Sequence, residues 1–360
     1  MRHRHFFAAA PVNFGPKCCN QAFAMNVDRG DRMRRRDFMT LVSGTAATWP
    51  LVANAQSDQM RRICVLMGMA QSDPAQQSLI SALIQGLREL GWQDGRNIRI
   101  DYRWGAGDAE KIQIFARLFV EQQPDVIVAH TTPVVAALKT QTSTIPIVFT
   151  QVSDPVDSGF VASLTRPGAN ISGFQNFEPA IGGKWLGVLK EAAPSMQRVA
   201  VLFSANSAAT VAFLRAAEAV APALAVEVTG VDVHGDVEIE RAIADFASQP
   251  DGGLIVTSHP NFVANRGLII LLAARHRLPA VYPFRYYATE GGLMSYGPDQ
   301  IDQWRGAATY VDRILRGEKP GELPVQAPTK YELVINLKSA KVIGLNIPPA
   351  FPLRADEVIE

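Results

Sequence analysis

The sequence predicts an α/β protein of two similar lobes, each built on a mainly parallel β-sheet covered by helices. Short apolar runs rich in β-branched residues alternate with helix-length segments along most of the chain. The runs at 126–129 and 145–149 are apolar throughout, which is typical of strands buried on both faces. The same order of elements occurs twice, displaced by roughly 130 residues. A length of 360 residues also exceeds what one hydrophobic core usually organises.

The first copy begins with an apolar run at 63–67. An amphipathic helix follows over 76–90, with Leu and Ile on one face, and Gly91 is expected to end it. The centre of this copy is a strand–helix–strand unit formed by 126–129, 133–141 and 145–149. The remaining predicted elements of this copy are a strand at 97–104 and a helix at 108–122.

The second copy repeats this order after a turn-rich crossing at 166–173. Its predicted strands cover 198–203, 226–231, 253–256 and 279–283, and its predicted helices cover 207–224, 236–248 and 261–277. A helix at 299–316, an extended Pro-rich segment at 319–328, a strand at 331–336 and a tail follow. We expect lobe 1 at 61–172 with part of 287–325 returning to it, lobe 2 at 173–286, and a C-terminal return over the hinge at 326–360. Repeated crossings form a hinge that lets lobes close on a ligand.

The first 55 residues read as an upstream extension followed by an export signal. Arg34–Arg36 precede an uncharged stretch of about 13 residues, too short to span a bilayer, and Ala53-Asn54-Ala55 has the small-x-small form of a cleavage site. The pair Arg35-Arg36 is typical of a twin-arginine signal. We therefore expect a start at Met33 and cleavage near Ala55.

Composition and motifs exclude several classes of function. A net charge of +1 provides no broad field for nucleic acid or anionic membrane. No strand is followed by a Gly-rich phosphate loop, and G-x-S-x-G, H-E-x-x-H and Cys-x-x-Cys are absent from the sequence. His3, His5, Cys18 and Cys19 match no standard metal site, and Cys64 lies in an apolar run as a structural thiol. No cofactor or metal is expected.

The loops that follow the two central strands are the first candidate for a binding site. Parallel strands end at one edge of a sheet, and ligands bind in the crevice outside that edge. There, Thr131 and Thr132 precede Pro133 at a helix start, which suits an anion such as a carboxylate, although either threonine can simply cap the helix. Asp154 can hold a positively charged group, but Asp-Pro is also a common turn starter.

The complete set of candidate ligand contacts follows strands in both lobes. His130 and His259 occupy corresponding positions, where an acid/base pair is conceivable but ligand contact or loop packing is favoured, because no carboxylate or nucleophile is spaced to support catalysis. The candidates are Met69, Gln71, Ser72, His130, Thr131, Thr132, Ser153, Asp154, Asn206, Ser258, His259, Arg285 and Tyr296.

Several motifs resemble those of the ABC transporter substrate-binding family that includes bacterial tryptophan-binding and tyrosine-binding proteins. The resemblance runs from about residue 61 to the end, through the segments GLRELGW (86–92), IPIVF (145–149), DPV (154–156), RPGANISG (166–173), GGLMSYG (291–297) and ADEVIE (355–360). It implies a type I periplasmic binding protein-like fold of two Rossmann-like lobes, export to the periplasm, and delivery of a small-molecule solute to a membrane permease. We expect the protein to act as a monomer. It also favours ligand contact for Asp154 and Thr131–Thr132.

One position departs from the family pattern. Members usually have Gly-Thr or Gly-Ser after the third strand, whereas His130 precedes Thr131 here. A side chain at this position is expected to narrow or polarise the pocket, so the resemblance does not fix the solute as tryptophan or tyrosine. We expect an amino acid or a related zwitterion or carboxylate, with its ammonium at Asp154 and its carboxylate at Thr131–Thr132. The alternatives are a secreted two-lobed enzyme using His130 or His259, and the sensing domain of a regulator.

Overall fold

The computed structural model describes residues 60–360, all within one compact unit. The predicted upstream extension, the start at Met33 and the cleavage site near Ala55 lie outside the described residues. Within the unit, two sheets and their helices form the two lobes that the repeated element order predicts, so the predicted fold class is confirmed.

The first sheet has five strands, all parallel, in the order β2 (Ile98–Trp104), β1 (Arg61–Met67), β3 (Val126–His130), β4 (Ile147–Val152) and β5 (Ile171–Gln175). Alternate residues of β1 face opposite sides. Ile63 and Val65 pack on one side with α2 (Pro74–Glu89) and α11 (Gln300–Leu315), and Leu66 packs on the other with α3 (Ala109–Glu121) and α4 (Thr132–Gln141). Burial on both faces explains why β1, β3 and β4 contain continuous apolar runs.

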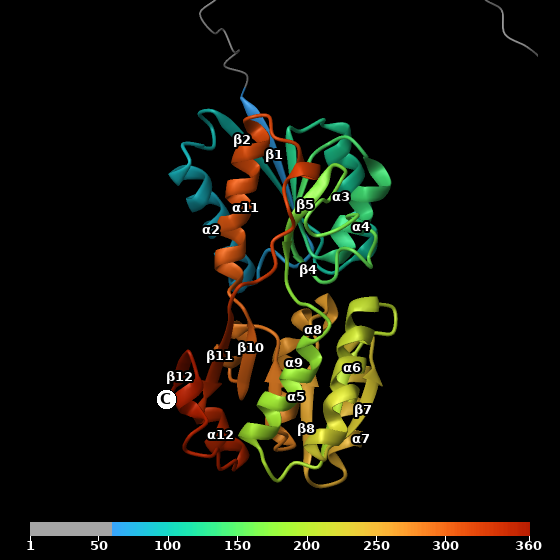
Figure 1. Ribbon diagram of the computed structural model, residues 1–360, viewed down its shortest axis with the longest axis vertical. Helices are drawn as coiled ribbons and strands as arrows, with labels where there is room; N and C mark the ends of the chain where they lie inside the picture. The colour runs from blue at the N-terminus through green and yellow to red at the C-terminus, as the bar shows by residue number, and fades with distance from the viewer. Residues whose placement is uncertain (1–59) are drawn as a thin grey trace, which may run out of the picture. The chain divides into compact units, whose positions relative to one another are not determined.

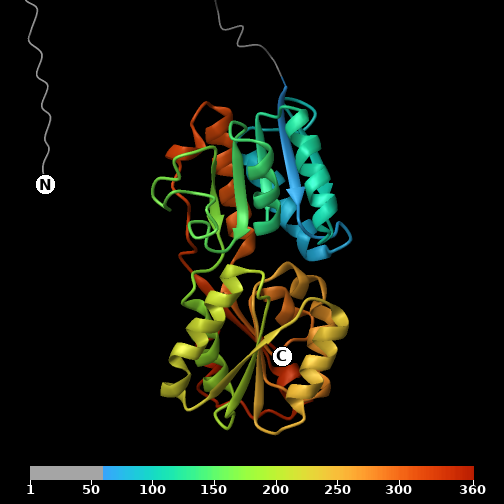
Figure 2. The ribbon, with the colours of Figure 1, turned by 90° about the vertical axis from the view of Figure 1, so that its right-hand side faces the viewer.

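Helix α11 comes from far along the chain and lies beside α2 on the first sheet (Figures 1 and 2). A Cβ atom at Gly86 would lie 2.8 Å from the Ala308 Cβ, so glycine allows the two helices to approach closely at this point. The predicted helix at 299–316 is therefore confirmed, and its packing partner is the first lobe.

The second sheet has seven strands in the order β12 (Glu357–Ile359), β11 (Tyr331–Asn336), β10 (Met294–Pro298), β9 (Ala280–Tyr282), β8 (Gly252–Val256), β6 (Arg198–Phe203) and β7 (Glu227–Asp232). Only β10 and β11 pair antiparallel among these strands. The helices of this lobe are α5 (Ile181–Ala192), α6 (Ala208–Val220), α7 (Asp236–Ala247), α8 (Pro260–Ala264), α9 (Arg266–Arg275), α10 (Arg285–Thr289) and α12 (Leu337–Ile343).

Helix α5 and strand β5 are absent from the sequence-based prediction. Three glycines in α5 lower its helix propensity, which hides the helix from pattern reading. In the structure Gly182 allows α5 to pack closely against α6, because a Cβ there would lie 1.9 Å from the Phe213 carbonyl oxygen of α6. The single helix predicted at 261–277 is wrong: α8 and α9 are separate helices that meet at Asn265.

The chain passes between the two sheets three times: after β5, after β10 and before β11. Strand β5 extends the first sheet beyond residue 172, and β11 and β12 belong to the second sheet. The segment 326–360 therefore crosses back to the second lobe and adds two strands to its sheet. The exact limits of the lobes stay a prediction.

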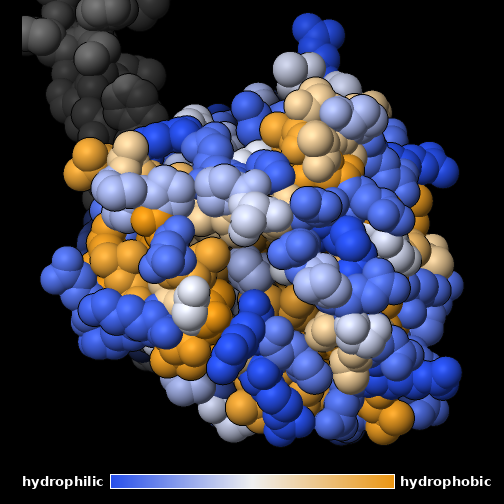
Figure 3. All heavy atoms as spheres, turned by 90° about the horizontal axis from the view of Figure 1, so that it is seen from below, coloured by the Kyte–Doolittle hydropathy of each residue, from blue (hydrophilic) through white to orange (hydrophobic). Residues whose placement is uncertain are grey.

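The surface of the described residues offers no membrane-spanning element: none of their helices is both long and apolar enough to cross a bilayer. Hydrophilic residues cover most of the face seen in Figure 3, with hydrophobic residues in smaller groups between them. This face therefore presents no single continuous apolar surface.

Candidate ligand-binding site

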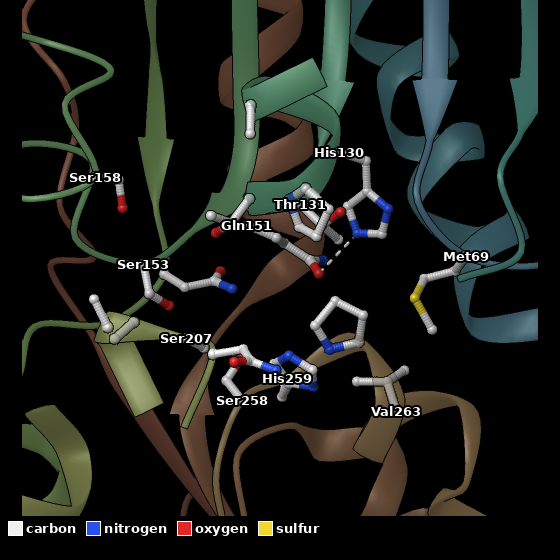
Figure 4. A pocket seen from close by; sticks show the side chains of 18 of the residues that line it. Met69, His130, Thr131, Gln151, Ser153, Ser158, Ser207, Ser258, His259 and Val263 are labelled. Atoms are coloured by element: carbon white, nitrogen blue, oxygen red, sulfur yellow. Dashed lines mark hydrogen bonds between the residues drawn. The ribbon is translucent and has the colours of Figure 1, made fainter. Parts of the chain in front are cut away.

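A cavity of about 400 Å³ lies where strands of both sheets end. Its wall combines the loops after β1, β3, β4 and β5 of the first sheet with those after β6, β8 and β9 of the second (Figure 4). The lining residues are Met69, Gln76, His130, Thr131, Thr132, Pro133, Ala136, Gln151, Ser153, Ser158, Phe160, Asn176, Asn206, Ser207, Ala208, Ala209, Ser258, His259, Pro260, Val263 and Phe284. This is the crevice in which open α/β sheets bind ligands.

The N-termini of two helices, one from each lobe, lie at this cavity. At the start of α4, Thr131 is the N-cap residue without a side-chain cap hydrogen bond, and Thr132 and Pro133 line the wall. At the start of α6, the Ser207 side chain accepts from the Thr210 N–H, and Ala208 lines the wall. The first N–H groups of a helix have no partner inside the helix, so both starts favour a negatively charged group of a ligand.

The wall is polar without being charged. Among the described residues that line it, none is Asp, Glu, Lys or Arg. Several buried atoms also have no hydrogen-bond partner within the described part of the chain: Gln76 Oε1, His130 Nδ1, Thr131 Oγ1, Gln151 Nε2 and Asn176 Oδ1. Since buried polar groups are normally paired, these atoms are the natural contacts for a solute or for ordered water.

His130 is fully buried and its ring faces the Trp304 ring at 5.6 Å between centroids. Its Nε2 lies 2.9 Å from Gln151 Oε1. Because a carbonyl oxygen only accepts, Nε2 carries the proton and donates it, which leaves Nδ1 with a lone pair. Burial lowers the pKa of His130 to about 4, so the imidazole is neutral at physiological pH.

His259 is the second histidine of the wall. Its Nδ1 accepts a hydrogen bond from the Asn261 N–H at 3.3 Å, as the N-cap of the short helix α8. Burial, with a smaller contribution from His234, lowers the pKa of His259 to about 4. Both histidines are therefore neutral hydrogen-bonding groups, and no carboxylate among the described lining residues orients either of them.

Three of the eight non-glycine residues with positive φ in the described part of the chain lie at or beside the cavity. Thr131, Gln151 and Asp154 have φ angles of 81°, 55° and 48°, in the region that side chains other than glycine rarely adopt. Gly68 leaves room for the Thr131 side chain, since a Cβ there would lie 2.3 Å from Thr131 Oγ1. Strained residues cluster where a binding site needs a defined backbone, and here they end β3 and β4.

The structure brings together eight of the predicted contacts in the cavity wall: Met69, His130, Thr131, Thr132, Ser153, Asn206, Ser258 and His259. The other five are Gln71, Ser72, Asp154, Arg285 and Tyr296, which lie outside the wall. Gln71 and Ser72 are exposed on the loop before α2.

Arg285 and Tyr296 have partners elsewhere in the second lobe. The Arg285 guanidinium pairs with Glu357 of β12, a strand absent from the prediction. The Tyr296 ring stacks on Tyr331 of β11, and its carbonyl accepts from Trp185 Nε1 at 2.7 Å. Tertiary pairing of the C-terminal strands therefore takes both residues away from the cavity.

Asp154 lies in the loop between Ser153 and Ser158, both of which line the cavity. Its carboxylate accepts from the Asp157 N–H at 3.3 Å, as expected of a turn starter. Burial is the main cause that raises the pKa of Asp154 above its usual range. The carboxylate is thus partly desolvated and lies next to the wall, but does not form part of it.

Several wall residues were missed by the sequence-based prediction. Gln76 and Gln151 are the clearest cases: Gln76 is a fully buried amide on the apolar face of α2, and Gln151 is a buried amide near the end of strand β4. A polar residue on an apolar face is a signal that sequence reading can use. Asn176 carried no such signal, because it follows β5, a strand that was not predicted.

Comparisons with known proteins agree with this geometry. Residues 65–359 match the family described as ABC transporter substrate binding protein. A tyrosine-binding protein of Clostridioides difficile (strain R20291) is 25% identical over 298 residues, which cover 81% of this chain and 84% of that protein.

Among solved structures, a conserved domain protein from Vibrio cholerae is 28% identical, with a TM-score of 0.78 over 83% of this chain and 100% of that one. The ABC domain from Streptococcus pneumoniae in complex with L-Trp is 23% identical, with a TM-score of 0.77 over 83% of this chain and 100% of that one. At this level of identity, the second similarity supports the fold alone.

Proposed function

Because the chain belongs to the ABC transporter substrate-binding protein family, we propose that it captures a small polar solute in this cavity and delivers it to the permease of an ABC importer. Proteins of this family bind a small molecule and work outside the cytoplasmic membrane. The observation that carries the proposal is the cavity wall, in which unpaired buried polar atoms and helix starts from both sheets meet. We place this chain in the periplasm, exported by the signal within residues 1–55, and expect it to act as a monomer without nucleic acid.

The solute we propose is an amino acid or a related zwitterion or carboxylate. The start of α4 would receive the carboxylate, because Thr131 Oγ1 and the Thr132 N–H have no partner inside the helix. The name of one relative, a tyrosine-binding protein, supports an amino acid. The ammonium would be held by Asp154, whose partly desolvated carboxylate adjoins the wall.

The wall supports binding rather than turnover. Both histidines are neutral and engaged with Gln151 and with the Asn261 N–H. A general base needs a carboxylate or similar partner that orients it toward a nucleophile. Within the described wall, neither histidine has such a partner. The alternative of a secreted enzyme thus has no specific observation in its favour.

A thermal-shift screen of residues 56–360 against amino acids, small carboxylates and sugars tests the proposal. A solute at 100 times its Kd should add about 2.7 kcal/mol of stability. Ala208→Trp should block the cavity and abolish the shift, whereas Ala219→Trp, an exposed position on the same helix, should not. Conversion of a bound solute into a product would contradict the proposed binding role, and stabilisation by sugars alone would contradict the proposed amino-acid or carboxylate solute.

A further inference from the structure

The hydrogen bond between His130 and Gln151 lies inside the cavity wall and joins two side chains that are both buried. In Figure 4 the Gln151 side chain reaches toward the middle of the cavity, and the dashed line joins it to His130. His130 is 0% exposed and Gln151 is 8% exposed, so water competes little for their polar atoms. His130 is the last residue of β3, and Gln151 lies in the neighbouring strand β4, directly after Thr150, which the register places opposite His130.

This bond determines whether a ligand meets the oxygen or the NH₂ of the Gln151 amide. His130 Nε2 donates to Oε1 of the amide, which occupies one lone pair of the oxygen and holds the amide in one orientation. The amide NH₂ has no partner among the described residues. An amide free to rotate would offer a ligand either its oxygen or its NH₂, whereas the amide held by His130 offers the NH₂.

We propose that His130 is a positioning residue that holds the Gln151 amide with its NH₂ available to the cavity, and that the pair selects solutes carrying a hydrogen-bond acceptor on the group that lies against it. The inference rests on the proposed function and adds the chemical class of that group. The acceptor is an oxygen of a hydroxyl, carbonyl or amide group. A hydrocarbon group of the same shape would bury the NH₂ without a partner.

Other unpaired atoms of the wall indicate that the solute group should also donate a hydrogen bond. Gln76 Oε1, His130 Nδ1 and Asn176 Oδ1 accept hydrogen bonds but have no donor in the described part of the chain. A solute group that both accepts and donates, such as a hydroxyl or an amide, can satisfy the NH₂ together with one of these acceptors. The wall therefore favours a polar group over an aliphatic or plain aromatic one.

The test uses matched pairs of amino acids that differ by the polar atoms: L-tyrosine and L-phenylalanine, L-threonine and L-valine, L-asparagine and L-leucine. Titration calorimetry measures the Kd of each with residues 56–360. A buried donor left without a partner lowers the binding free energy. For any pair that binds, we therefore expect the oxygen-bearing member to bind about 5- to 150-fold more tightly.

Variants separate positioning from a structural role. His130→Leu should lower the preference, because the amide can then rotate and binding of the polar group must order it. His130→Gln keeps an N–H donor near the position of Nε2 and should restore most of the preference. Gln151→Met should lose the preference as well, and the double variant should lose no more than either single variant.

The outcomes distinguish the inference from the function on which it rests. Binding with equal affinity within every pair would overturn the inference alone. A His130→Leu variant that weakens both members of a pair equally would also overturn it, because that result describes a structural role. If none of the six amino acids binds, the amino-acid form of the proposed function and this inference are both wrong.

Discussion

Arg266 of α9 donates to both carboxylate oxygens of Asp73, at 2.7 and 2.9 Å, and so joins the second lobe to the first. Asp73 is the N-cap residue of α2, where it also accepts from the Ala75 N–H at 3.0 Å. The same guanidinium bonds Glu290 at 2.8 Å and lies 5.1 Å from the centre of the Tyr286 ring. The Arg266 and Asp73 side chains are only 14% and 10% exposed, so solvent screens this contact weakly.

The first prediction concerns the free energy of this interlobe ion pair. Arg266→Met should destabilise the protein by about 3–5 kcal/mol, because Asp73 and Glu290 keep their charges without a partner. In a double-mutant cycle with Asp73→Asn, which retains a helix cap, the coupling free energy should be about 1–3 kcal/mol. Urea denaturation measures each unfolding free energy.

The control for this cycle is the pair Arg313–Glu318, whose side chains are 44% and 46% exposed. Its coupling free energy should lie below about 1 kcal/mol, as is usual for ion pairs in solvent. Equal coupling free energies for the two pairs would show that the interlobe ion pair stabilises the protein no more than an exposed one.

The second prediction concerns stability at acidic pH. His130 has an ordinary pKa of 6.5 when unfolded and a pKa of about 4 when folded. The unfolded chain therefore binds more protons between these values, and the free energy of unfolding should fall as the pH decreases from 6.5 to 4. His130 should account for up to about 3 kcal/mol of this loss.

Comparison with His130→Gln isolates this contribution. His259 also has a lowered pKa, so the variant should retain part of the acid sensitivity and lose the part due to His130. Urea denaturation at about pH 7.5 and about pH 4.5, on either side of most of this window, provides the measurement. The same pH dependence in both proteins would refute the role of His130.

The third prediction concerns the charge of Asp154. If this carboxylate holds the ammonium of the solute, Asp154→Asn should weaken binding by about 10- to 150-fold and leave the stability unchanged, because charge-assisted hydrogen bonds exceed neutral ones. If its hydrogen bond to the Asp157 N–H is its whole role, Asn should serve equally well. Calorimetry with the identified solute decides, and a loss below about threefold would remove the ammonium assignment.

The fourth prediction concerns the strained backbone of Thr131, which has φ 81°. Thr131→Gly relieves a strain of about 1–3 kcal/mol, offset in part by the greater backbone entropy of glycine, so the stability should be maintained or increased. The affinity for the solute should fall, because the unpaired hydroxyl is removed from the wall.

Two further variants serve as controls for this trade-off. Ala106→Gly, at φ 53° and exposed away from the cavity wall, should keep full affinity. Thr131→Ser retains the hydroxyl and should bind nearly as well as the parent protein. A Thr131→Gly variant of unchanged affinity would mean that the hydroxyl does not contact the solute.

The sequence by itself determined the parts of this protein that depend on local pattern. The apolar runs of β1, β3 and β4 identified strands buried on both faces, and the repeated order of elements indicated two lobes. Loops that follow parallel strands share one edge of the sheet, and this rule was enough to predict that His130, Thr131 and His259 line the cavity.

Only the tertiary structure decided which distant segments complete each lobe. Helix α11 packs on the first sheet, while β11 and β12 join the second and draw Arg285 to Glu357. Packing of α2 on the first sheet likewise brought Gln76 into the wall. Such contacts depend on hydrogen bonding and side-chain fit between residues far apart in the chain, and the period of a single segment carries no information about its distant partner.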